Sequence, residues 1–215
     1  ISEKRYCLYI IKNNLEVNIM TLKGTKTAEN LLKAFAGECQ ANRRYTYYAS
    51  VAKKQGYVQI ASIFEETADQ ESMHAKRFFK FLNEDKELQG EMLGMTADYP
   101  VALYEETLEN LKAAAAGENE EWTDLYPEFA KVAREEGFGA IAAAFDKIAE
   151  VEARHEIRYN KLIENIETNS VFQKSEVVEW KCTKCGYIHT GEKAPVKCPA
   201  CLHDQGYFEI NNTNY

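Results

Sequence analysis

The feature that most constrains this sequence is a glutamate-x-x-histidine pair that occurs twice within long helical patterns. The pairs are Glu71 with His74 and Glu152 with His155, and the second copy follows the first by 81 positions. Residues three apart on a helix project from the same side, so each pair delivers a carboxylate and an imidazole to one point. In both copies that side is also the apolar one. The fold must therefore bury charge-bearing groups.

Four segments have the apolar periodicity of amphipathic helices. They are expected at residues 27–56, at residues 57–85, around residues 108–125, and in a last segment that ends near residue 167. Thr27 is expected to cap the first helix, and Pro127 to bend or restart the third. On the third helix the inward stripe is expected to include Trp122 and Leu125. Two helix pairs separated by a glycine-containing loop predict an antiparallel bundle.

Five carboxylates fall on the inward stripes of these helices: Glu38, Glu71, Glu118, Glu121 and Glu152. Glu38 recurs as Glu118, 80 positions later, so the two helix pairs are related by duplication. An isolated buried charge costs more than the net stability of a domain, about 5 to 15 kcal/mol, so such groups must be paired or bound to metal. Two divalent ions supply four positive charges and nearly balance five carboxylates.

One such pair alone is typical of a solvated helix surface, and a lone buried histidine is usually a hydrogen-bonded core residue. Two pairs at equivalent places, each preceded by a further glutamate, indicate a dinuclear carboxylate site instead. A glutamate from each of two helices and Glu-x-x-His from the other two is the pattern of ferritin-like di-iron proteins. Oxygen-rich ligation with two imidazoles suits iron or manganese.

The carboxyl-terminal part contains a second candidate site. After a polar linker at residues 167–176, two Cys-x-x-Cys pairs follow with 12 residues between them: Cys182, Cys185, Cys198 and Cys201. Four thiolates at this spacing predict a tetrahedral sulfur site for one iron or one zinc. Disulfides are the alternative, and a cytoplasmic chain would keep the thiols reduced. Cys39 fits neither site and is expected to be a small core residue.

Composition and charge restrict the partners. The net charge of -8 argues against nucleic acid or an anionic membrane as a partner. No apolar run approaches the roughly 20 residues that a membrane-spanning helix needs, so a cytoplasmic location is expected. Residues 1–19 differ in pattern from the rest, and Met20 opens a segment typical of a natural start. We expect residues 1–19 to be a non-native leader, with a genuine extension as the alternative.

From Met20 onward the chain resembles the rubrerythrin family. The similar segments are LKGTKTAENLLKAFAGE, RYTYY, FEETADQE, HAKRFFKFL, AAAAGENEEW, YPEFAKVAREEGF and CTKCGYIHTGEKAPVKCPAC. The resemblance implies a mainly α fold, with an antiparallel four-helix ferritin-like bundle over residues 20–166. It further implies a small rubredoxin-like metal-binding β domain over residues 177–215.

The resemblance also implies a function. It implies a di-iron centre and a mononuclear Fe(Cys)4 iron, with zinc as the alternative metal at the four cysteines. The activity would be that of a peroxidase that reduces hydrogen peroxide to water in the oxidative-stress defence of an anaerobe-type cytoplasm. No G-x-G-x-x-G fingerprint is present, so electrons would come from a separate reductase or rubredoxin. A homodimer is also implied.

Site roles carry over by matching positions. Glu38, Glu71, Glu118, Glu152 and His155 would ligate iron, with Glu71 and Glu152 bridging the two ions. The remaining matched residues are His74 and Glu121, as ligands that exchange with redox state, and Tyr45 and Tyr126, as hydrogen-bonding partners of the ligands. Both tyrosines could instead be ordinary core aromatics.

The chain departs from the family pattern at positions that are not predicted ligands. Cys39 replaces a common serine, Asp204 a common proline, and Leu202 stands where many rubredoxin knuckles carry glycine. Leu202 puts the geometry of its turn in question. Two other functions stay open: a ferroxidase or iron-handling protein that prefers dioxygen, and a bundle whose cysteines hold a structural zinc.

Overall fold

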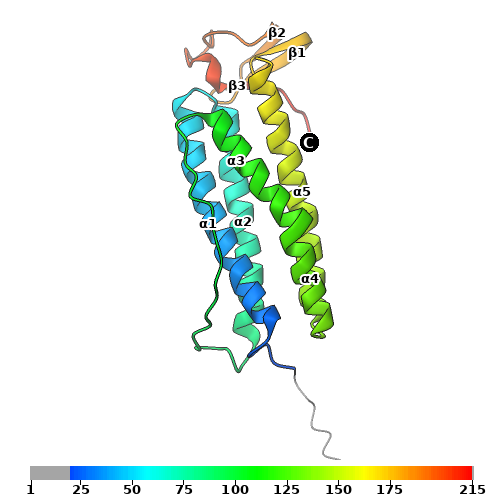
Figure 1. Cartoon of the computed structure of the whole chain (residues 1–215). Helices are drawn as coiled ribbons and strands as arrows, with labels where there is room; N and C mark the ends of the chain where they lie inside the picture. Colours follow the sequence, from blue (N-terminus) through cyan, green and yellow to red (C-terminus); the bar gives the residue numbers. More distant parts are fainter. Residues whose placement is uncertain (1–19, 215) are drawn as a thin grey trace, which may run out of the picture.

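A helical bundle with a small β-sheet at one end forms the molecule (Figure 1). The computed structural model describes residues 20–214, so the expected leader at residues 1–19 lies outside the described part. The bundle elements are α1 (Lys26–Lys54), α2 (Val58–Glu84), α3 (Thr107–Glu120), η1 (Glu121–Leu125), α4 (Tyr126–Glu135) and α5 (Gly139–Glu167). The remaining elements are β1 (Gln173–Cys182), β2 (Ile188–Lys193), η2 (Gln205–Tyr207) and β3 (Phe208–Ile210).

The helices form two antiparallel pairs, as the sequence predicted. A long connection, residues 85–106, runs back along α1 and brings the chain to the end of the bundle where α3 begins (Figure 1). Side chains fasten this connection to α1: the Tyr99 hydroxyl donates to the Lys33 carbonyl at 2.9 Å, and the Tyr48 hydroxyl donates to the Ala102 carbonyl at 2.8 Å. One crossover of this kind is characteristic of ferritin-like bundles.

The predicted cap of the first helix was wrong by two residues. Thr25, not Thr27, is the N-cap, because its side-chain oxygen accepts the Ala28 N–H at 3.1 Å. Thr27 instead donates both its N–H and its hydroxyl to the Glu136 carboxylate, at 2.8 and 2.6 Å. Thr27 therefore ties the start of α1 to the end of α4.

The third helical segment contains a π-helical turn that the sequence analysis missed. In η1 the Tyr126 N–H donates to the carbonyl of Glu121, five residues earlier. This wide turn rotates the side chains that follow it around the helix axis, relative to their places in a regular α-helix. Tyr126 is consequently buried, whereas Trp122 and Leu125, which were predicted to point inward, are 36% and 38% exposed.

Two aromatic clusters lie on either side of a polar layer. One cluster is built around Phe64 and Tyr159, whose ring centroids are 5.3 Å apart. The other is built around Phe78 and Phe145, at 4.8 Å. These four residues are the duplicated apolar positions of the sequence, and all are fully buried. Because the polar layer is closed above and below by aromatic rings, it has a low dielectric environment.

The carboxyl-terminal sheet has the strand order β2-β1-β3 and is antiparallel throughout. Its β1 begins at Gln173, inside the segment expected to be linker. The sheet contacts the turn between α1 and α2, where Tyr57 stacks on Phe172 with centroids 6.2 Å apart. A side chain on Gly206 would come within 2.1 Å of the Gly56 carbonyl, so only glycine fits there. No helix within residues 20–214 is long and apolar enough to span a membrane.

Candidate metal centres

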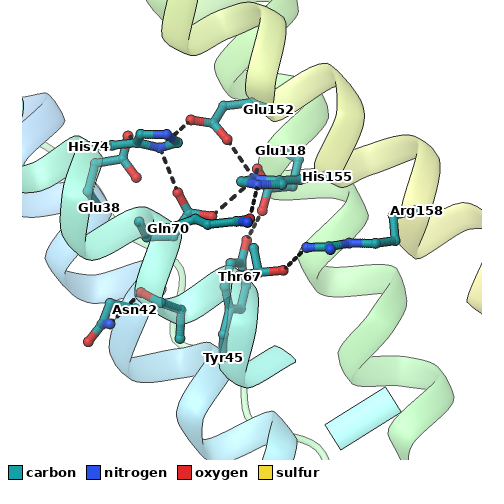
Figure 2. A network of polar contacts seen from close by, with 12 residues as sticks. Glu38, Asn42, Tyr45, Thr67, Gln70, His74, Glu118, Glu152, His155 and Arg158 are labelled. Atoms are coloured by element: carbon teal, nitrogen blue, oxygen red, sulfur yellow. Dashed lines mark hydrogen bonds and ion pairs between the residues drawn. The ribbon is translucent and has the colours of Figure 1, made fainter. Parts of the chain in front are cut away.

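The polar layer of the bundle contains two groups of ligand-type side chains that share two members. One group is Glu38, Glu71, His74 and Glu152, and the other is Glu71, Glu118, Glu152 and His155. Within each group the ligand atoms lie within 4.8 Å of one another. The helices α1, α2, α3 and α5 each contribute, and the side chains converge from them as Figure 2 shows. Each group has the size and composition to hold one metal ion.

The two halves of this cluster mirror each other around the shared glutamates. Nδ1 of His74 lies 3.0 Å from Oε2 of Glu71 and 2.9 Å from Oε1 of Glu152. Nδ1 of His155 lies 3.2 Å from Oε1 of Glu71 and 2.7 Å from Oε2 of Glu152. Each shared carboxylate thus presents one oxygen to each half, which is the arrangement a bridging ligand requires.

Each half contains one further glutamate, whose carboxylate accepts a hydrogen bond from a tyrosine hydroxyl. Tyr126 donates to Oε1 of Glu38 at 2.5 Å, and Tyr45 donates to Oε1 of Glu118 at 2.6 Å. Both tyrosines are almost fully buried. The two side chains predicted as hydrogen-bonding partners therefore occupy that place, and each fixes the orientation of one carboxylate.

Several buried polar atoms in this layer have no hydrogen-bond partner within residues 20–214. They include one oxygen each of Glu38, Glu71 and Glu118, both oxygens of Glu152, and Nδ1 of His155. Buried polar groups are nearly always satisfied, so a cluster of such atoms pointing at one another needs an explanation. Metal ions between the carboxylates and imidazoles would satisfy them, and the donor set of oxygens with two nitrogens fits iron or manganese.

The pKa shifts of the carboxyl groups in this layer also favour bound metal ions. Burial raises the pKa of Glu38 well above its ordinary range, and the charges of Glu71 and Glu152 raise it further. Burial also raises the pKa of Glu118, to about 8, with the Glu71 charge adding to the rise. Carboxyls that resist ionisation in this way become stable anions when cations are bound beside them.

The imidazoles supply positive charge to the metal-free layer. Burial lowers the pKa of His74, but the close carboxylates of Glu152 and Glu71 more than offset this and raise it to about 9. For His155, contacts with Glu118, Glu152 and Glu71 outweigh burial and raise the pKa to about 12. Glu71, which faces both imidazoles, has its pKa lowered to about 2 despite its burial. Two imidazolium ions thus balance part of the carboxylate charge in the place that metal ions would take.

Glu121 is the one predicted bundle ligand that belongs to neither group of ligand atoms. It lies in η1 and lines a cavity of about 340 Å³ together with Arg44, Tyr126 and Gly37. Burial raises the pKa of its carboxyl, and the nearby charges of Glu118 and Glu152 contribute. Its carboxylate therefore lies beside the polar layer without joining it, and π-helical turns frequently mark functional positions of this kind.

The four cysteines of the carboxyl-terminal domain converge as predicted. Sγ of Cys182 lies 3.7 Å from Sγ of Cys201, and Sγ of Cys185 lies 3.6 Å from Sγ of Cys198. A tetrahedral site with metal–sulfur bonds of about 2.3 Å has sulfur–sulfur edges of about 3.8 Å. The sulfur spacing therefore fits one tetrahedral metal ion, iron or zinc, and none of the four is in a disulfide.

The two cysteine turns have the same backbone form. The Gly186 N–H donates to the Cys182 carbonyl and the Leu202 N–H donates to the Cys198 carbonyl, both at 2.9 Å. Gly186 has φ +77° and Leu202 has φ +62°. The leucine therefore preserves the turn that glycine usually makes, at the energetic cost of a left-handed backbone.

The structure corrects the assignment of Cys39 and adds one residue, Gln70, that the sequence did not single out. Cys39 is exposed rather than part of the core, and it lines a surface groove with Arg43 and Lys76. Gln70 was not singled out, yet its Oε1 lies 2.8 Å from Nε2 of His155. Its position directly before Glu71 was the only available signal, and a helix neighbour of a ligand is not by itself distinctive.

Comparisons with known proteins agree with this geometry. The family model described as Rubrerythrin matches residues 29–163, and that of the rubrerythrin rubredoxin-like domain matches residues 180–209. Rubrerythrin-1 of Clostridium acetobutylicum is 63% identical, over 91% of this chain and 99% of its own length. A structure of partially reduced nigerythrin has a TM-score of 0.58 and 30% identity, covering 98% of this chain and all of that one. A bacterioferritin structure from Desulfovibrio desulfuricans, whose title names a diiron site, has a TM-score of 0.58 and 26% identity, over 67% of this chain and 82% of that one.

Proposed function

The chain belongs to the rubrerythrin family, and from this membership and the geometry of its two centres we propose that it is a non-haem di-iron peroxidase. It would reduce hydrogen peroxide to water in a cytoplasm, with electrons relayed through an iron at the four cysteines. The observation that carries the proposal is the pair of ligand groups sharing Glu71 and Glu152, present in one chain with a tetrahedral cysteine cluster.

Iron at the bundle site would supply the redox chemistry. Reduction of one peroxide to two waters consumes two electrons and two protons, and a pair of ferrous ions held there would supply one electron each. Glu71 and Glu152 would bridge the ions, while Glu38 with His74 and Glu118 with His155 would hold one ion each. The close spacing of these groups would present both ions to the same small oxidant.

The protein side chains would keep the site oriented and supplied with protons. The hydroxyls of Tyr126 and Tyr45 would hold Glu38 and Glu118 in place through their hydrogen bonds of 2.5 and 2.6 Å. Glu121 lies in the cavity beside the site, and its raised pKa favours a protonated carboxyl there. We assign it two roles: a proton reservoir for the departing oxygen, and a carboxylate that replaces His74 when the iron is oxidised. Hard ferric iron prefers oxygen ligands, whereas ferrous iron accepts imidazole.

The cysteine cluster would act as the electron relay. Cys182 and Cys198 are buried, whereas Cys185 is exposed at the surface of the domain. An electron donor, either a reductase or a rubredoxin, could therefore approach the metal through the exposed side. The proposal also includes a homodimer, as the family resemblance implies.

The test is the rate at which the reduced protein reacts with two oxidants. The iron-loaded full chain is reduced anaerobically and mixed with hydrogen peroxide or with dioxygen, and the ferric-thiolate absorption is followed in time. The proposal predicts that peroxide restores this absorption much faster than dioxygen does. Faster recovery with dioxygen would refute the peroxidase assignment.

The similarity to bacterioferritin favours a second candidate, a ferroxidase that consumes dioxygen while it oxidises ferrous iron. The same mixing experiment separates the two, because a ferroxidase responds to dioxygen first. A structural zinc at the cysteines is the other alternative. Metal analysis of protein from its native host decides this, since zinc there would leave the bundle without its relay.

A further inference from the structure

The two imidazoles of the bundle differ in the hydrogen-bonding partner of the ring nitrogen that points away from the carboxylates. Nε2 of His155 is 2.8 Å from Oε1 of Gln70 (Figure 2). Because an amide oxygen only accepts, Nε2 is the nitrogen that donates in this contact. Nδ1 is therefore the atom that faces the carboxylates. Nε2 of His74 has no hydrogen-bond partner of this kind among residues 20–214, and the His74 side chain is 13% exposed against 4% for His155. Both imidazoles contact the shared glutamates through Nδ1, but only that of His155 is also held at Nε2.

Gln70 is itself held by a chain of polar contacts between α2 and α5. Its Nε2 donates to Oε1 of Glu66 at 3.1 Å, which places its carbonyl oxygen toward His155. The same Glu66 oxygen accepts from Arg158 at 2.9 Å. Arg158 also donates to the hydroxyl of Thr67 at 2.5 Å, an interaction visible in Figure 2. The glutamine side chain thus has little freedom to turn away from the imidazole.

The duplication shows that this network exists in only one half of the bundle. The residues 81 positions away are Val151 for Gln70, Lys147 for Glu66, Ile148 for Thr67, and Arg77 for Arg158. Val151 and Ile148 offer no hydrogen-bond acceptor to an imidazole. Lys147 pairs with Glu150 at 2.6 Å, and the Arg77 guanidinium lies 4.3 Å from the centre of the Phe81 ring. Of these four residue types only the arginine recurs in the other half, and there it contacts an aromatic ring.

We propose that Gln70 is a positioning residue that makes the metal position beside Glu118 and His155 the tighter of the two. The metal position beside Glu38 and His74 lacks such a hydrogen-bonding partner and has the lower metal affinity. The inference rests on the proposed metal-binding function of the bundle. Partners of this kind behind a metal-binding histidine typically change metal affinity 10- to 100-fold. The proposed ligand exchange between His74 and Glu121 would then fall on the half whose imidazole has no partner at Nε2.

Sequential binding of cobalt to the metal-free full chain tests this. One equivalent of Zn²⁺ is added first to fill the cysteine site, which thiolates make the preferred one. Co²⁺ is then titrated and followed by absorption and calorimetry. The wild type is expected to bind two equivalents in the bundle, the first more tightly. Gln70→Leu lowers the affinity of the first equivalent about 10- to 100-fold, whereas Val151→Gln raises that of the second.

Two variants separate positioning from general damage. Gln70→Glu keeps an acceptor beside Nε2 of His155 but loses the donor to Glu66, so it is expected to keep more of the first affinity than Gln70→Leu does. Gln59→Leu makes the same chemical change on α2 outside the network and is expected to change neither equivalent. An exchange-protected, cobalt-shifted imidazole N–H proton in the NMR spectrum is expected in the wild type and in Gln70→Glu, and is lost in Gln70→Leu.

Three results would overturn the inference. They are an equal loss at both equivalents in Gln70→Leu, an unchanged first equivalent in that variant, and a second equivalent that Val151→Gln leaves unchanged. Cobalt binding involves neither peroxide nor electron transfer. The inference and the peroxidase proposal can therefore fail independently of each other.

Discussion

Replacing His74 by glutamine is expected to change the pH dependence of stability in the metal-free protein. The imidazolium of His74 contacts Glu71 and Glu152, and its pKa is raised from 6.5 to about 9. At about 1.4 kcal/mol per pH unit, this rise corresponds to about 3 kcal/mol of stabilisation. The side chain is only 13% exposed, so solvent screens the interaction little.

The direction of the effect follows from the raised pKa. Because the folded-state pKa lies above the unfolded-state value, the stabilisation is complete below about pH 6.5 and is lost as the pH rises through about 9. His74→Gln is therefore expected to lower the free energy of unfolding by about 3 kcal/mol at pH 6, and by little at pH 10. Glutamine keeps a neutral donor at every pH and preserves much of the side-chain volume.

Urea unfolding of the bundle in the presence of a chelator, followed by helical circular dichroism from pH 6 to pH 10, measures this. His189→Gln makes the same substitution in the carboxyl-terminal sheet, outside the bundle, and is the matched control. If His74→Gln lowers the free energy of unfolding by the same amount at every pH, the electrostatic reasoning is refuted. A wild-type stability that rises between pH 6 and pH 9 would refute it as well.

Three further predictions concern individual groups. Tyr126→Phe removes the buried bond to Glu38 and is expected to lower the free energy of unfolding by about 1.5 to 3 kcal/mol, measured by urea unfolding at pH 7. Metal binding to the bundle is expected to release protons at pH 7, because His74 and His155 are protonated in the metal-free site. Calorimetry in buffers of different ionisation enthalpy counts the released protons. An absence of proton release would contradict the assigned charges. Cys201→Ser is expected to abolish tight metal binding at the cysteine site while the helical signal of the bundle stays unchanged, since the two sites lie in separate cores.

The side chains of the candidate bundle centre could be predicted from the sequence because their pattern is periodic and duplicated. Glu71 and His74 recur at a fixed displacement on a face that is otherwise apolar, and helical geometry alone brings such residues together. The cysteine cluster was equally predictable, because its short spacing fixes the ligands locally. In both cases the repeated unit is a motif of only four residues.

The features that sequence reasoning missed depend on contacts between distant segments. The π-helical turn at Glu121 changes which face is buried, and local propensity does not distinguish it from a regular helix. Thr25 and Thr27 are both suitable caps, and the contact with Glu136, more than 100 residues away, decides between them. Gln70 becomes recognisable only when the opposite helix is in place.

The most direct test of the central claim is the number of electrons that hydrogen peroxide removes from the reduced protein. Fully reduced, iron-loaded protein is titrated anaerobically with peroxide while the ferric-thiolate absorption is recorded. Two electrons in the bundle and one at the cysteines require about 1.5 molecules of peroxide per chain for complete reoxidation, since each peroxide accepts two electrons. An endpoint of about 1.5, with full return of the absorption, would support a bundle peroxidase connected to its relay. An absorption that does not return with peroxide would contradict it.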